Sequence, residues 1–137
     1  MSAENVEVVR AAYGAFMKGD LQGLGAYLAD ETEWETPESL PTGGLVRGRE
    51  AVLGNFAQIP QYWSEFSIEP DEYIDAGDHV IVRGVQRAVG AGGTTQSRYL
   101  HLSTLRDGQI VRGEFIGDTA DSLRALGKRA DAGAGSA

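Results

Sequence analysis

The spacing of hydrophobic residues changes once along this 137-residue chain, near Phe66. Before that point apolar residues recur every three or four positions, which is the spacing of one helix face. After it they alternate with polar residues between short glycine-containing turns, as in antiparallel strands joined by hairpins. Helices grouped before strands indicate an α+β domain with the helices packed on one face of a sheet.

Three helices and one strand are predicted in the first half of the chain. An apolar stripe over residues 6–17 forms the first helix, and Asp20 caps a short second one. A third stripe covers residues 52–63 and is interrupted or ends at Pro60. Between the second and third helices, residues 31–36 alternate as a strand.

The second half is predicted to be a meander of long antiparallel strands followed by a short C-terminal helix. The strands are expected at residues 66–74, 79–89, 94–105 and 109–117. Pro70 implies an edge position or a bulge, and Asp107-Gly108 is a strong hairpin signal. We expect a cone-shaped curved sheet with the three helices of the first half around a pocket. The domain should cover residues 1–127, and residues 128–137 should be a disordered tail.

Composition restricts the partners of the chain. Twenty acidic against 12 basic residues give a net charge of −8, which disfavours nucleic acids and anionic membranes. No apolar run reaches the roughly 20 residues that a membrane-spanning helix needs, and no signal peptide is recognised. Cysteine is absent, and two histidines without a carboxylate cluster predict no metal site. We therefore expect a cytoplasmic protein that uses no metal and no other cofactor.

Several short motifs occur in a characteristic order. They are Gly19-Asp20-Leu21, Trp34-Glu35-Thr36-Pro37, Gly48-Arg49-Glu50-Ala51-Val52, Ala76-Gly77-Asp78-His79-Val80 and Asp107-Gly108-Gln109-Ile110-Val111. Together they resemble the SnoaL-like group of the nuclear-transport-factor-2-like superfamily, over about residues 3–127. The resemblance implies a pocket for a small hydrophobic metabolite and cofactor-independent proton transfer, as in polyketide cyclases, ketosteroid isomerases and limonene-epoxide hydrolases. The alternative is a non-catalytic ligand-binding or dimerisation module of the same fold.

The acid–base residues of those enzymes do not recur at the matching positions. The isomerase base falls at Thr36, its protonated aspartate falls at Leu100, and its tyrosine lies one residue from Tyr13. An aspartate of the hydrolases and cyclases falls at Phe115, although a one-residue bulge would bring Glu114 there instead. Threonine, leucine and phenylalanine cannot exchange a proton near neutral pH. The resemblance thus implies the pocket but does not identify the acid and base residues of a mechanism.

The candidates for proton transfer are Glu35, Tyr13 and Asp118. Glu35 flanks a loop at the pocket, where burial would raise the pKa of its carboxyl group. Asp118 is also suited to cap the last helix. His101 is expected on the convex side of the sheet, where a packing or interface role is more natural than catalysis.

The resemblance also implies which strand residues face the pocket. The predicted ligand-binding residues are Trp34, Thr36, Arg83, Arg98, Leu100 and Phe115. Two guanidinium groups in an apolar cavity would bind an anionic group, because an unpaired buried charge is very unfavourable. The alternatives are that they pair with Glu35 or Glu114, or that one or both lie near the open rim and are solvated. The opposite sheet face, with Tyr99, His101, Arg112, Glu114 and Ile116, would form a homodimer interface.

Overall fold

The computed structural model describes residues 2–127, so the predicted tail at residues 128–137 lies outside it. The described elements are α1 (Ser2–Met17), α2 (Leu21–Gly25), β1 (Leu28–Thr36), β2 (Gly44–Arg47), α3 (Arg49–Ala57), α4 (Ile59–Tyr62), β3 (Glu65–Ala76), β4 (His79–Gly90), β5 (Gly93–Arg106), β6 (Gln109–Gly117) and α5 (Thr119–Leu126). The predicted α+β class is confirmed. None of these helices is both long and apolar enough to cross a membrane.

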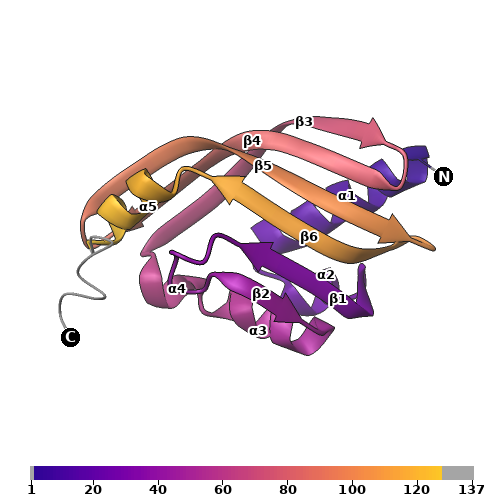
Figure 1. The fold of residues 1–137 in the computed structure, drawn as a ribbon, viewed down its shortest axis with the longest axis horizontal. Helices are drawn as coiled ribbons and strands as arrows, with labels where there is room; N and C mark the ends of the chain where they lie inside the picture. The colour runs from indigo at the N-terminus through magenta and orange to yellow at the C-terminus, as the bar shows by residue number, and fades with distance from the viewer. Residues whose placement is uncertain (1, 128–137) are drawn as a thin grey trace.

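One curved sheet holds all six described strands, in the order β2-β1-β6-β5-β4-β3. Neighbouring strands are antiparallel except β1 and β6, which run parallel. Figure 1 shows α1 packed across the sheet and α5 at the end where β4 meets β5. The sheet does not close on itself, so its concave side remains available to enclose a cavity with the helices.

Local signals placed most of the elements correctly. Asp20 accepts a hydrogen bond from the Gly23 amide at the start of α2, as predicted for its cap. Pro70 lies in β3, an edge strand, and the register shifts between Pro70 and Glu72, so both expectations for this proline hold. Asp107 and Gly108 both have positive φ, 52° and 76°, as the tight hairpin turn between β5 and β6 requires.

Two features of the first half differ from the prediction. The third helical stripe, expected to be interrupted or to end at Pro60, is two helices that break earlier, at Gln58, and Pro60 lies in the first turn of α4, where a missing amide costs no hydrogen bond. Strand β2 was not predicted. It has only four residues after a turn-rich loop, and it exists because Val46 pairs across from Trp34 of β1. That pairing is a tertiary contact that leaves no periodic signal.

The inward and outward faces of β4 and β5 are the reverse of those expected. Val80 and Val82 are completely buried against the helices, whereas Arg83 points outward and is exposed. On β5, Tyr99 is buried and Arg98 is exposed. Because strand side chains alternate, an error of one residue moves every side chain to the other face. Apolar residues occur on both faces of β4, so alternation alone did not identify the inner one.

Candidate functional site

A cavity of about 160 Å³ lies between the concave face of the sheet and helices α1, α3 and α4. Aromatic rings make up much of its wall: Tyr13, Phe16, Trp34, Phe56, Tyr62, Trp63, Phe66 and Phe115. An apolar cavity of about 150 Å³ is large enough to hold a benzene molecule in another protein. A largely apolar wall with a few polar groups is the usual composition of a small-molecule site.

The aromatic wall is held by edge-to-face contacts that run from β1 to α1. The Trp34 and Phe56 rings are 5.1 Å apart at 83°, and Phe56 meets Phe16 at 5.6 Å and 78°. Phe16 in turn meets Phe66 of β3 at 6.2 Å and 81°. Such perpendicular arrangements are favourable for aromatic pairs. These rings therefore support one another around the cavity without a ligand.

A hydrogen-bonded chain of three side chains crosses the cavity wall. The Tyr13 hydroxyl oxygen lies 3.1 Å from His101 Nδ1, and His101 Nε2 lies 3.3 Å from the Ser103 hydroxyl oxygen. The Trp34 ring meets His101 edge-to-face at 5.1 Å. A Cβ at Gly113 would lie 2.6 Å from Trp34 and 3.2 Å from His101 Nε2, so the absence of a side chain there makes this contact possible.

Burial sets the protonation of this pair. Loss of water lowers the pKa of His101 to about 4, because the charged imidazolium is poorly solvated in the apolar wall. Burial, followed by the nearby Tyr99 hydroxyl, raises the pKa of Tyr13 above its ordinary value. At neutral pH His101 is therefore an uncharged proton acceptor, and Tyr13 remains a hydrogen-bond donor.

The loop between β1 and β2 contributes Leu40, Pro41 and Thr42 to the cavity wall. Asn55 of α3 donates to the Thr42 carbonyl at 3.0 Å, which ties the loop to the helix layer. Gly43 is required where the loop turns back, because a Cβ there would lie 1.9 Å from the Pro37 carbonyl oxygen. The loop is thus fixed by both backbone geometry and a side-chain hydrogen bond.

Tyr13 is the one predicted catalytic residue that lines the cavity. The Glu35 carboxylate instead forms a short ion pair with Arg112 on the outer face of the sheet. Asp118 is exposed and caps α5, where it accepts a hydrogen bond from the Asp121 amide at 3.0 Å. Of the two roles that the sequence suggested for Asp118, the structure shows the helix cap.

The predicted ligand-binding residues divide between the two faces of the sheet. Trp34, Thr36 and Phe115 line the cavity. Arg83 and Arg98 lie on the outer face and pair with Glu72 at 3.7 Å and Asp71 at 3.2 Å. Leu100, on the same face, is 44% exposed. Placing these three in the cavity was wrong because it followed from the reversed face assignment.

A bulge does not bring Glu114 into the cavity. The register between β5 and β6 shifts between Thr104 and Leu105, before the strand reaches Glu114. Glu114 then pairs with Leu102 on the outer face, and Phe115 keeps its inward position. The one-residue bulge that would have turned Glu114 into the cavity is therefore absent at this point of β6, and Phe115 lines the wall.

Sequence reasoning missed His101, Gln86 and Ser122 as cavity residues. The sequence did contain a signal for the first two. On β4 the alternating set with Gln86 carries no charge, whereas the other set contains Arg83 and Arg87. On β5 the set with His101 has no lysine, arginine, aspartate or glutamate, whereas the other set contains Arg98. Charged residues are rarely buried without partners, so the uncharged set is the better choice for the inner face. Across residues 2–127 no group of three histidine, aspartate or glutamate side chains could hold a metal ion.

Comparisons with known proteins agree with this fold. The SnoaL-like domain family matches residues 9–113. An NTF2-like protein of unknown function from Burkholderia pseudomallei is 29% identical, covers 90% of this chain and 97% of its own, and has a TM-score of 0.85. TerC, crystallised with polyporic acid, is 28% identical over 91% of this chain and 99% of its own, with a TM-score of 0.85.

A further similar structure is IdmH from Streptomyces antibioticus, provisionally described as a polyketide cyclase. It is 26% identical over 90% of this chain and 98% of its own, with a TM-score of 0.73. No curated protein sequence matches the chain. The resemblance predicted from the sequence motifs is confirmed by the match over residues 9–113. The chain belongs to the SnoaL-like domain family.

Proposed function

We propose that this chain binds a small hydrophobic metabolite in its cavity and acts on it by cofactor-independent proton transfer, as a cyclase or isomerase. The Tyr13–His101 pair carries the proposal, because it combines an uncharged proton acceptor with a hydrogen-bond donor in an apolar wall. Among the described lining residues the other ionisable side chains are Glu33, which pairs with two arginines, and Tyr62 of α4.

The two side chains suit different parts of one reaction. When a proton leaves a carbon next to a carbonyl group, the electron pair moves to the carbonyl oxygen as an enolate. In the tautomer in which His101 Nδ1–H donates to the Tyr13 oxygen, Nε2 would take that proton in place of its contact with Ser103, and the Tyr13 hydroxyl would donate its own proton in a hydrogen bond to the enolate oxygen. Return of the proton from His101 to another carbon of the enolate completes an isomerisation. Alternatively, the enolate carbon attacks a second carbonyl carbon of the same molecule, the C=O π bond breaks, and the resulting alkoxide takes the proton from His101, which completes a ring closure. Neither route needs an electron carrier.

The relatives support a ligand of this kind. TerC was crystallised with polyporic acid, and IdmH is provisionally described as a polyketide cyclase. The aromatic wall of this chain, with Trp34, Phe56 and Phe115, would pack against a planar apolar ligand.

Isothermal titration with 2-naphthol tests binding in the cavity. We expect wild-type protein to bind this probe and the Thr36→Trp variant to lose at least tenfold in affinity, because an indole would fill the cavity. Glu31→Trp adds the same indole at an exposed position of the same strand and should bind like wild type. No binding to wild type, or equal loss in both variants, would contradict the proposal.

A second measurement tests the base. In 5-nitrobenzisoxazole, removal of one C–H proton breaks the ring N–O bond and releases a coloured phenolate. We expect a rate that is constant above about pH 5 and falls below the His101 pKa of about 4, where the imidazole becomes protonated. His101→Gln should lower the rate about 100-fold, since a positioned base contributes roughly that factor. His79→Gln, at an exposed position, should leave it unchanged. A rate that survives His101→Gln would remove the catalytic role.

The outer face of the sheet favours a second role, in dimerisation. Leu100 and Ile116 are paired across β5 and β6 and are 44% and 55% exposed. Exposed apolar neighbours of this size often mark a protein interface. We expect light scattering to give twice the chain mass for wild type, a single chain mass for Ile116→Lys and the dimer again for Met17→Lys, a control at an exposed helix position. A monomeric wild type would contradict the dimer.

A further inference from the structure

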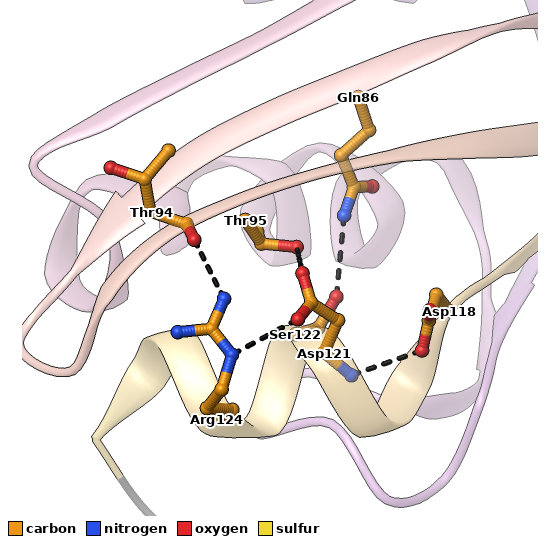
Figure 2. Close-up of polar contacts among 7 residues, drawn as sticks. All are labelled: Gln86, Thr94, Thr95, Asp118, Asp121, Ser122 and Arg124. Carbon is orange, nitrogen blue, oxygen red and sulfur yellow. Dashed lines mark hydrogen bonds and ion pairs between the residues drawn. The ribbon is translucent and has the colours of Figure 1, made fainter.

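A second pair of polar side chains lines the cavity, at the end covered by α5. Gln86 of β4 is 6% exposed and Ser122 of α5 is 3% exposed, and both face the cavity. Gln86 Nε2 donates to the Ser122 hydroxyl oxygen at 3.3 Å. Figure 2 shows this amide nitrogen directed at Ser122 and the amide oxygen turned away from it. The Gln86 amide oxygen does not take part in the bond to Ser122, so it can accept a further hydrogen bond.

An unpaired hydroxyl lies beside this amide. Ser97 of β5 stands opposite Gln86 in the strand register, and its hydroxyl oxygen is buried without a hydrogen-bond partner in residues 2–127. A buried polar group left unpaired costs about 1–3 kcal/mol, so native proteins rarely keep one without a reason. Ser97 itself is not a lining residue, but the Ser122 hydroxyl is, and while it accepts from Gln86 it keeps its own proton for a polar ligand group.

Helix α5 holds this end of the cavity in place through a separate set of contacts (Figure 2). Asp121 accepts hydrogen bonds from Thr95 of β5 and from Arg124 Nε, the latter at 3.0 Å. Arg124 also donates to the Thr94 carbonyl at 2.7 Å. Because these charges are engaged with one another and with the strand, the adjacent Gln86–Ser122 pair is an uncharged, fixed hydrogen-bonding surface.

The cavity wall offers no positive charge to a ligand. None of its described lining residues is a lysine or an arginine, and the low pKa of His101 keeps that side chain neutral. A carboxylate buried here would lose its water without gaining a partner of opposite charge, which is very unfavourable. The anionic ligand expected from the sequence depended on Arg83 and Arg98, which lie outside. The cavity therefore favours hydroxyl and keto groups over carboxylates.

The distance between the two polar ends restricts the ligand further. His101 pairs with Val82 across β4 and β5, and Gln86 lies four residues further along β4. Four residues of a strand span roughly 13 Å, and a hydrogen bond of about 3 Å at each end leaves roughly 7 Å between two ligand oxygens. That is the separation of oxygens at opposite ends of two fused six-membered rings.

We propose that Gln86 and Ser122 form a second ligand subsite, which binds a neutral oxygen at the end of the metabolite remote from His101. This inference rests on the proposed function, because it concerns the same cavity. It identifies the substrate class as uncharged, with one oxygen for Tyr13 and His101 and another for the Gln86–Ser122 pair.

Isothermal titration with three related probes tests it. Wild type should bind 2,6-dihydroxynaphthalene about tenfold more tightly than 2-naphthol, because one good hydrogen bond is worth about that factor. It should bind 6-hydroxy-2-naphthoate at least tenfold more weakly than the dihydroxy probe. Gln86→Met and Ser122→Ala should each lose the preference for the second hydroxyl while still binding 2-naphthol. Gln96→Met, at an exposed position of β5, should keep it.

The outcomes separate the two proposals. If 2-naphthol binds but the second hydroxyl adds nothing, or the carboxylate binds best, the second subsite is wrong and the proposed cavity function survives. If Gln86→Met also loses 2-naphthol while its thermal unfolding is unchanged, Gln86 shapes the cavity and does not select the second oxygen. If no probe binds wild type, both proposals fail.

Discussion

The two faces of strands β4 and β5 differ in charge: the inner face is uncharged, and the outer face carries ion pairs. The inner face carries Val80, Val82 and His101, none of them charged at neutral pH, around an apolar cavity. The outer face carries Arg83 and Arg98, each paired with an acid from β3. Exposed ion pairs contribute little to stability, because water solvates both partners well. On the inner face water is excluded, which lowers the pKa of His101 and disfavours any charged group.

The largest expected effect is the pH dependence of the free energy of unfolding that buried His101 on the inner face causes. Its pKa falls from an ordinary 6.5 to about 4 in the folded protein, so below pH 6.5 the unfolded chain takes up a proton that the folded chain refuses. Stability from this site is complete above pH 6.5 and is lost as the pH falls towards 4, by about 3 kcal/mol. Urea unfolding at pH 7 and pH 4 should therefore show the difference between wild type and His101→Gln shrinking by about that amount. Parallel losses in the two proteins would mean that His101 is not held neutral by burial.

An alanine substitution on each face of β6 should have unequal effects. Gly113→Ala would place a Cβ 2.6 Å from the Trp34 ring, and overpacking of this kind costs about 1–3 kcal/mol. Glu114→Ala alters the neighbouring residue on the outer face and should change the free energy of unfolding by less than about 0.5 kcal/mol. Thermal unfolding of both variants measures the contrast. Equal shifts would show that the wall around Trp34 can relax.

The smallest expected contrast compares one hydrogen bond on each face. Tyr13→Phe removes the hydroxyl group that bonds His101 at 3.1 Å, which should cost about 1 kcal/mol of unfolding free energy. Arg98→Gln removes an exposed ion pair with Asp71 and should cost less than about 0.5 kcal/mol. Urea titrations with matched slopes can resolve this difference. A larger effect at Arg98 would contradict the assignment of the two faces.

Much of the fold could be predicted because its signals are local. The helix stripes, the Asp20 cap, the edge strand with Pro70 and the Asp107-Gly108 turn each depend on a few neighbouring residues. Strand β2 could not be predicted, because its four residues become a strand only by pairing with β1. Of the residues predicted to line the cavity, Trp34, Thr36 and Phe115 do so, whereas the reversed faces of β4 and β5 put His101 on the outside.

By itself the sequence determined that this chain folds as helices followed by a strand meander, because periodicity and turn residues act over short distances. It also contained the motifs that place the chain in the SnoaL-like family. Only the tertiary structure decided which side of each strand meets α1, because that choice depends on packing between distant segments. That choice also decided which polar residues line the cavity. It excludes Arg83 and Arg98 and encloses the Tyr13–His101 pair at one end and Gln86 with Ser122 at the other.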